Sequence, residues 1–325
     1  MRNRRTSPVL TILVPAAVLG LIVSYFFLPG GEMPGTAFIR TEWLSILLAM
    51  VCLGATAVSL GLLNYSSFLF TSDTRLLYLP FLLTVLSIPG AMHLSVYHIA
   101  AFLMVWSIYF VTRYISSEHI RPAYAFGAVL LSGAASMTVP QLVYVQIYIF
   151  LYCLYMRGQS PVRYILSCIG AAAVPWIYVM AWCYISPLSL QSTEFLSHFR
   201  EGMALSLPDT AGMPLTGMIW CGITLMLGIR AAVFVLTRSR ERNKAQKNAF
   251  AFSVALSVVC LLAAVFCGGF QEPLSAMVTA VPLSFPVFDL FTNGRRIEVR
   301  LWVVLLILAA AAIRVSEFLP GLLPF

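Results

Sequence analysis

The sequence predicts an all-α fold, a polytopic bundle of transmembrane helices with a cytoplasmic N-terminus. Hydrophobic residues make up 60% of the 325-residue chain, charged residues only 10%, and the mean hydropathy is +0.91. A soluble domain carries about a quarter of its residues charged. Apolar runs of about 20 residues, the length that crosses ~30 Å of hydrocarbon, recur along the chain. Basic residues fall almost entirely on one side of the path that these runs trace.

Charged residues and breaks marked by Pro or Gly divide the chain into eleven apolar segments that we predict to be helices. They are 8–28, 42–63, 76–89, 95–115, 122–137, 140–156, 163–186, 214–237, 248–269, 273–290 and 298–316. The third and fifth are short, so ten spans are an alternative to eleven. We expect a single integral membrane domain over 1–325, because the longest stretch between spans, 187–213, is too short to form its own core.

The first segment could be taken for a secretory signal peptide, because MRNRR is a positive n-region ahead of an apolar run. That run is longer than the apolar part of a signal peptide, which is about 7–15 residues. PGGEMPG also lacks a small-x-small cleavage site. We therefore expect a retained first span.

The distribution of Lys and Arg predicts the orientation. With a cytoplasmic N-terminus, sixteen of the twenty lie on the cytoplasmic side: Arg2, Arg4, Arg5, Arg75, Arg113, Arg121, Arg157, Arg163, Arg238, Arg240, Arg242, Lys244, Lys247, Arg295, Arg296 and Arg300. Arg40, Arg200 and Arg314 lie outside, and Arg230 lies within the eighth segment. Short cytoplasmic loops are enriched in Lys and Arg, so this distribution favours the N-terminus inside and, with eleven spans, the C-terminus outside.

The net charge of +8 follows from the same loops. Cationic loops are attracted to anionic headgroups, so the lipid bilayer is the partner that we expect. The densest basic run, 238–248, has no interleaved aromatic residues of the kind that stack on bases, so we expect no nucleic acid.

Neither the cysteines nor the histidines predict a metal site or a cofactor. The seven cysteines all lie inside predicted spans and show no CxxC spacing. His93 and His98 are five residues apart, whereas a zinc-binding helix needs i, i+4 spacing and a carboxylate. The chain has no Walker loop, no GxSxG and no Gly-rich dinucleotide turn. We expect no metal and no cofactor.

The loop after the first segment contains the one residue that we nominate for catalysis, Glu32. It lies close to the predicted membrane surface, and Arg40 and Glu42 follow it. A carboxylate held at that depth is partly desolvated, which suits it to act as a base on a lipid-linked substrate. Arg40 would bind a phosphate. The alternative is that Glu32 is a solvated loop residue without a catalytic role.

Residues 189–207 predict an amphipathic helix on the outer face. Its apolar residues recur at a spacing of three to four: Phe195, Leu196, Phe199, Met203 and Leu207. His198 and Arg200 are among the polar residues on the remaining surface. Such a helix either covers a lateral entrance to a site, with these two residues contacting substrate, or simply connects two spans.

Polar side chains inside the predicted spans are candidates for a substrate path. Arg230 lies within the eighth segment, where it either contacts substrate, extends toward the cytoplasmic interface, or forms a structural ion pair for which Asp289 is the candidate partner. Tyr144, Tyr148 and Tyr152 recur one turn apart on the sixth segment, which favours either bundle packing or a polar, sugar-lined cavity.

The tenth segment carries two prolines one turn apart, Pro282 and Pro286. Each removes a backbone hydrogen bond, so we predict a break or a kink near the middle of the membrane. Transporters use broken helices of this kind to bind substrate.

Two stretches resemble a known family. TRLLYLPFLLTVL and AYAFGAVLLSGAASMTVPQLVYVQIYIFLYCLYMRGQSPVRYILSCIGAAAVPWIYV are similar to an uncharacterised Bacteroidetes family of polytopic inner-membrane proteins of similar length. In that family a Gly-rich helix precedes a Pro-led helix, a short loop with Arg, and a helix with Pro in its outer half. The corresponding residues are Gly127, Gly133, Pro140, Arg157, Arg163, Gly170 and Pro175. The later AVPLSFPVFDLF resembles the penultimate span of that family.

More faintly, the same region resembles multi-spanning glycosyltransferases of the C-type fold, which use lipid-phosphate-linked sugars. They too have a helix that ends in Pro-Trp, here Pro175 and Trp176. The first outer loop of that fold carries the catalytic acid, a position that Glu32 would match. This chain departs from the pattern in having a short first loop without an Asp-acid pair and no extracytoplasmic domain.

Three function classes stay open for a multi-pass protein of the bacterial inner membrane. The first is envelope glycan or lipid biogenesis, with glycosyltransferase-like chemistry on a lipid-linked sugar through Glu32 and with Arg40 or Arg200 on the phosphate. The second is a transporter or flippase of a lipidic substrate, working through Arg230 and the tyrosines. The third is a non-catalytic subunit or scaffold that binds other membrane proteins.

Overall fold

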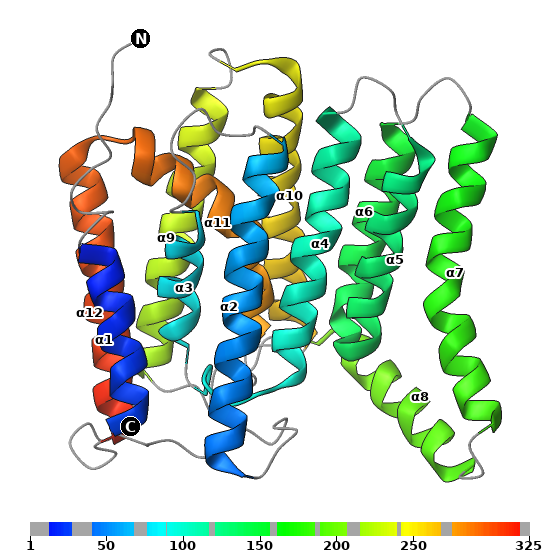
Figure 1. The fold of residues 1–325 in the computed structure, drawn as a ribbon, viewed down its shortest axis with the longest axis horizontal. Coiled ribbons are helices and arrows are strands. Elements are labelled where there is room, and N and C mark those ends of the chain that lie inside the picture. The colour runs from blue at the N-terminus through cyan, green and yellow to red at the C-terminus, as the bar shows by residue number, and fades with distance from the viewer. Residues whose placement is uncertain are drawn as a thin grey trace.

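The computed structural model describes residues 13–27, 41–67, 77–88, 90–116, 121–156, 161–185, 189–206, 215–238, 242–267 and 275–318. Within these ranges the fold is all-helical (Figure 1). The helices are α1 (Val14–Phe27), α2 (Glu42–Ser67), α3 (Tyr78–Leu86), α4 (Val96–Ser116), α5 (Pro122–Thr138), the 3-10 turn η3 (Pro140–Leu142), α6 (Val143–Tyr155), α7 (Pro161–Ile185), α8 (Ser189–Met203), α9 (Leu215–Thr237), α10 (Lys244–Phe266), α11 (Ser275–Asn293) and α12 (Arg296–Phe318). Each of the eleven predicted segments overlaps one of these α-helices, and α8 forms within the segment predicted to be amphipathic.

Five of the described helices, α2, α4, α7, α10 and α11, are long and apolar enough to cross a membrane. This supports a membrane protein, whereas eleven spans and a cytoplasmic N-terminus stay predictions. Helix α3 has nine residues, about 14 Å at 1.5 Å per residue, and reaches only half-way across ~30 Å of hydrocarbon.

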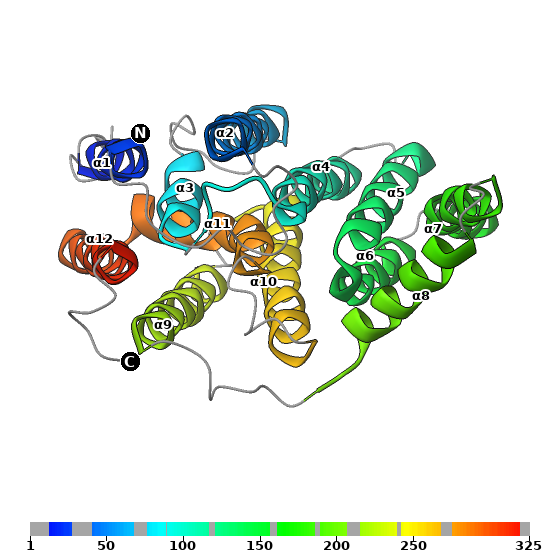
Figure 2. The same cartoon turned by 90° about the horizontal axis from the view of Figure 1, so that it is seen from below.

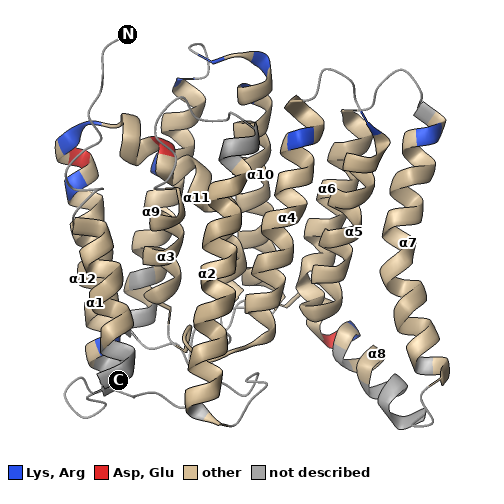
Figure 3. Ribbon diagram, viewed as in Figure 1, with Lys and Arg blue, Asp and Glu red and all other residues tan. Residues whose placement is uncertain are grey.

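Lys and Arg gather at one end of the bundle, where α4, α9 and α11 end and α5, α7, α10 and α12 begin (Figure 3). We call this the basic end, and its described members are Arg113, Arg121, Arg163, Arg238, Arg242, Lys244, Lys247, Arg295, Arg296 and Arg300. The opposite end, where α8 lies, is called the α8 end; it holds Arg200 and Arg314. The segregation of charge along the sequence is therefore also a segregation in space.

Helix α11 lies at the centre of the larger group of helices, packed against α3, α4, α9 and α10 (Figures 1 and 2). Of the two alternatives predicted at its prolines, the break is wrong, because α11 is continuous from Ser275 to Asn293, and the kink stays a prediction. Pro286 has no N–H to donate to the carbonyl oxygen of Pro282. The hydroxyl of Ser253 in α10 donates to that oxygen instead, at 2.7 Å. A side chain of a neighbouring helix thus replaces the lost bond, as is common in membrane helices.

Helices α5, α6, α7 and α8 form a second group beside the first (Figure 2). The two groups meet where α5 packs on α4 and α6 packs on α10. Within the second group, Gly133 lets α5 approach both neighbours, since a Cβ there would lie 2.8 Å from Nε2 of Gln146 and 3.0 Å from Cγ of Pro175. Helix α7 is at the edge of the molecule and is the least buried of the five long apolar helices.

Candidate functional site

Helix α8 lies obliquely across the α8 end, beneath α6 and α7 (Figures 1 and 2). Phe199 attaches it to the bundle: this side chain is 3% exposed and meets Trp176 of α7 edge to face, with 4.9 Å between ring centroids. Gly202 packs on Pro140, where a Cβ would lie 2.9 Å from the proline Cβ. The hydroxyl of Tyr144 donates to the carbonyl oxygen of Met203 at 2.9 Å. The helix is therefore fixed at several points along its second half.

Two residues on the free side of α8 combine a charge with an apolar group. Arg200 and Leu196 are both exposed and stand one turn apart, so they share a face of the helix. The backbone of His198 lies between them, while its side chain lies outside the described residues. A cation beside an apolar side chain at the end of a membrane bundle can contact a lipid phosphate and its chain together.

The other predicted site residues of this region are not all placed. Glu32 and Arg40 lie outside the described residues. Of the substrate candidates, the structure brings Tyr144 to α8 and so near the helix that carries Arg200. Arg230 lies on α9, and the structure does not bring it to this place.

Tyr148 and Tyr152 of α6 lie at the interface between the two groups of helices, where they contact α10, while Tyr144 contacts α8 within the second group. Tyr148 stacks on Phe252 of α10 with 5.7 Å between centroids, and Tyr152 approaches the same ring at 4.6 Å. The hydroxyl of Tyr152 donates to the carbonyl oxygen of Asn248 at 3.4 Å. These contacts favour the packing interpretation of the tyrosine row, since the rings of Tyr148 and Tyr152 pack on α10 and the hydroxyls of Tyr144 and Tyr152 donate to backbone carbonyls.

Arg230 forms an ion pair, but with a partner other than the predicted one. Its Nε lies 2.6 Å from Oε1 of Glu298, and its Nη2 donates to Oε2 at 3.1 Å. Asp289 pairs with Arg242 instead. The prediction of an Arg230–Asp289 pair is wrong: α9 packs against both α11 and α12, but Arg242 and Asn293 occupy the Asp289 carboxylate on α11, and Arg230 pairs with Glu298 on α12.

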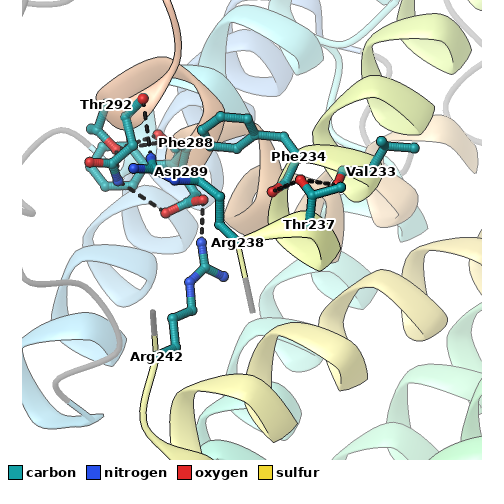
Figure 4. Close-up of polar contacts among 9 residues, drawn as sticks. Val233, Phe234, Thr237, Arg238, Arg242, Phe288, Asp289 and Thr292 are labelled. Carbon is teal, nitrogen blue, oxygen red and sulfur yellow. Dashed lines mark hydrogen bonds and ion pairs between the residues drawn. The ribbon is translucent and has the colours of Figure 1, made fainter. Parts of the chain in front are cut away.

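The Arg242–Asp289 pair is the most buried ion pair among the described residues (Figure 4). Nη2 and Oδ2 lie 2.5 Å apart, and the two side chains are 12% and 5% exposed. The Arg242 guanidinium also stands 4.0 Å above the ring of Phe250. Asn293 donates to Oδ1 of Asp289 at 3.1 Å, and Arg238 donates to the Asn293 carbonyl oxygen at 3.2 Å. The cluster ties the α9–α10 connection to the end of α11.

A cavity of about 10 Å³, room for about one water molecule, lies close to this cluster. Its wall is mostly apolar, and Thr112, Phe250 and Ser253 are among its residues. The two hydroxyls already donate to backbone carbonyls, Thr112 to Tyr109 and Ser253 to Pro282. The cavity is too small for an organic ligand, so it does not offer a substrate site.

His98, one of the two buried histidines among the described residues, has a structural role. Ser95 donates its backbone N–H to Nδ1 of His98 at 3.2 Å, and Nε2 of the same ring donates to the Ala91 carbonyl oxygen at 2.9 Å. His98 thereby closes the first turn of α4 in the manner of a capping box. Within the described ranges no three His, Cys, Asp or Glu side chains come together as a metal site.

No protein-family model, curated protein or solved structure matches this chain. The resemblances to the Bacteroidetes family and to the glycosyltransferases therefore stay predictions, and the function has to be argued from the residues themselves.

Sequence reasoning missed three members of the polar clusters: Glu298, Arg242 and Asn293. For two of them, Glu298 and Asn293, the sequence contains a signal that could have identified them. Glu298 begins one predicted apolar segment and Arg230 lies within another, and a charge in such a segment is costly unless it is paired. Asn293 follows Asp289 by four residues, the spacing at which side chains of a helix meet.

Proposed function

We propose that this chain is a multi-pass protein of a bacterial inner membrane that binds a phosphate-bearing lipid of envelope glycan or lipid biogenesis at its α8 end. The observation that carries the proposal is the exposed pair of Arg200 and Leu196 on a helix held in place by Phe199. An arginine gives charge-assisted, two-pronged contact to a phosphate, and the neighbouring apolar side chain suits the lipid chain.

The exposed aromatic residues support a membrane around the bundle. Trp43 at the start of α2 and Trp182 and Tyr184 near the end of α7 are exposed at the α8 end, and Tyr155 is exposed at the end of α6 at the basic end. Trp and Tyr concentrate at both membrane interfaces. They support the presence of two interfaces, and the basic end supports an orientation in which it is cytoplasmic and α8 is external.

Reporter fusions test this orientation. Fusions after Arg121, Arg163 and Asn248 are expected to report the cytoplasm, and fusions after Glu32, Gln191 and Phe325 the outside, because Lys and Arg hold the basic end inside. A cytoplasmic signal at Phe325 alone would mean ten spans in place of eleven. A cytoplasmic signal at Gln191 would contradict the orientation.

The most concrete form of the proposal is a glycosyl transfer. Glu32 would take the proton of an acceptor hydroxyl while the acceptor oxygen bonds to the anomeric carbon of the sugar and the bond from that carbon to the lipid phosphate breaks. Arg200 would hold the charge that develops on the departing phosphate. Tyr144 fixes the end of α8 and so positions Arg200 indirectly.

The lipid that copurifies with the protein tests the binding site. Phosphate-bearing lipid extracted from purified Arg200→Gln is expected to fall about tenfold or more below wild type, since a hydrogen bond to a charged group contributes about 1.5–3 kcal/mol. Arg163→Gln, which removes an exposed arginine from the basic end, is the matched control and should retain the lipid. Equal lipid content in the wild type and in Arg200→Gln would exclude Arg200 from the site.

A transporter is the second candidate, and α11 is the observation that favours it. This helix is the most buried of the five long apolar helices and carries two prolines. Its backbone is continuous, however, and Arg230 is paired with Glu298. Because of these contacts, α11 supports a transporter less directly than the exposed Arg200 of α8 supports lipid binding.

A further inference from the structure

Helix α12 presents a lipid-facing stripe that begins at the basic end. Exposed apolar side chains recur along it every three to four residues: Ile297, Leu301, Val304 and Leu308. Its opposite face is buried through Val299, Val303 and Leu306. Helix α9 packs beside it and has exposed apolar side chains of its own, among them Met226 and Ile229. This part of the molecule therefore faces acyl chains.

Cationic side chains flank the top of this stripe on both sides. Arg296 and Arg300 are exposed and one turn apart, and the helical repeat places both along one edge of the stripe. The same repeat places Glu298 along the other edge, where Arg230 of α9 meets it. Figure 3 shows these alternating basic and acidic bands in the first turns of α12.

The acid among these groups is already neutralised. Both oxygens of Glu298 are engaged by Arg230, at 2.6 Å and 3.1 Å, so little of its charge is left to repel an anion. Arg230 nevertheless remains 40% exposed at its side chain. Arg296 and Arg300 have no acidic neighbour on their own edge of the helix among the described residues. The net positive charge of these side chains therefore favours binding of a negatively charged group.

We propose that this surface binds an anionic phospholipid of the leaflet at the basic end. The phosphate lies between the arginine pair Arg296–Arg300 and Arg230, and the acyl chains run along Ile297, Leu301 and Val304. A free phosphate ion would satisfy the arginines alone. The apolar stripe of α12 starts at the same level as the arginines. The acyl chains of a lipid can cover this stripe, whereas a phosphate ion cannot, so we assign the site to a lipid. This site is at the opposite end from α8 and does not depend on the proposed function.

Native mass spectrometry of the full chain tests the site with phosphatidylglycerol and phosphatidylcholine as probes. Wild type is expected to retain phosphatidylglycerol preferentially. The double variant Arg296→Gln/Arg300→Gln is expected to lose about ten- to thirtyfold in that preference, because it removes the charge-assisted hydrogen bonds by which the proposed site holds the anionic headgroup.

A second double variant, Arg121→Gln/Arg163→Gln, is the matched control. It removes two exposed charges from the same end but leaves α12 intact, and its preference is expected to stay within about twofold of wild type. Equal losses in both double variants would show unspecific attraction and overturn the site. Displacement of the lipid by inorganic phosphate would overturn the lipid assignment.

Discussion

Replacing Asp289 by asparagine is expected to lower the free energy of unfolding by about 3–5 kcal/mol, because it leaves Arg242 as a buried charge without its counter-ion. The side chain of Arg242 is only 12% exposed, and its Nη1 is buried without a hydrogen-bond partner among the described residues. Water can therefore do little to replace the lost carboxylate. The stacking of the guanidinium on Phe250 keeps the charge in place.

Unfolding in mixed detergent micelles, followed by loss of helical circular dichroism, measures this effect. The apolar double variant Arg242→Met/Asp289→Leu is expected to recover most of the loss, since replacing a whole buried pair is often neutral or stabilising. Arg163→Gln, an exposed arginine at the same end, is the control and should change stability by no more than about 0.5 kcal/mol. If Asp289→Asn were as stable as wild type, the pair would not hold the α9–α10 connection on α11.

The helices could be predicted from the sequence because the signal for each lies within its own segment. A run of apolar residues bounded by charges is visible without knowledge of its neighbours, and all eleven runs overlap helices in the structure. The segment 189–207 gave the same kind of local signal through its spacing, and it forms α8 over most of its length. The gathering of basic residues at one end was predictable for the same reason, since it needs only the alternation of helix direction.

Which helices are neighbours could not be predicted, and the errors follow from that. Helix α9, which carries Arg230, packs against both α11 with Asp289 and α12 with Glu298, and the pairing of Asp289 with Arg242 could not be read from the sequence. The prolines of α11 are a similar case. The predicted break depends on the absence of a substitute donor, and Ser253 on α10 supplies one. The sequence shows that a proline lacks the N–H for a backbone hydrogen bond. It does not show that a side chain of another helix donates in its place.

In the candidate site, too, the arrangement of residues within one helix could be predicted, whereas contacts between helices could not. Arg200, Leu196 and the docking residue Phe199 belong to one helix, so their arrangement follows from its repeat. The contact of Tyr144 with the end of α8 links residues 59 positions apart in the chain, and no periodicity indicates it. The interpretation of the tyrosine row as a cavity wall failed to anticipate Phe252, which covers Tyr148 and Tyr152.

Glu32→Gln is expected to abolish function while leaving folding and the amount of protein in the membrane unchanged. Glutamine keeps the size and hydrogen bonding of the side chain but cannot take up a proton, and general-base catalysis is typically worth about 10²–10⁴-fold in rate. The sequence predicts Glu32 close to the membrane surface, the depth at which the phosphate of a lipid-linked sugar would lie. The measurement is complementation of a deletion strain, with the membrane level of each variant followed by immunoblot.

Glu42→Gln is the matched control, because it removes the charge of a second acid ten residues further along, at the first residue of α2. An acid there stabilises the positive end of a helix dipole by about 0.3–1 kcal/mol, so the control should be mild. Loss of function in Glu32→Gln together with retained lipid binding would separate catalysis from the site at Arg200. If Glu32→Gln instead complements as well as wild type, the transferase has lost its only nominated base, and binding or transport of the lipid without chemistry becomes the function to test.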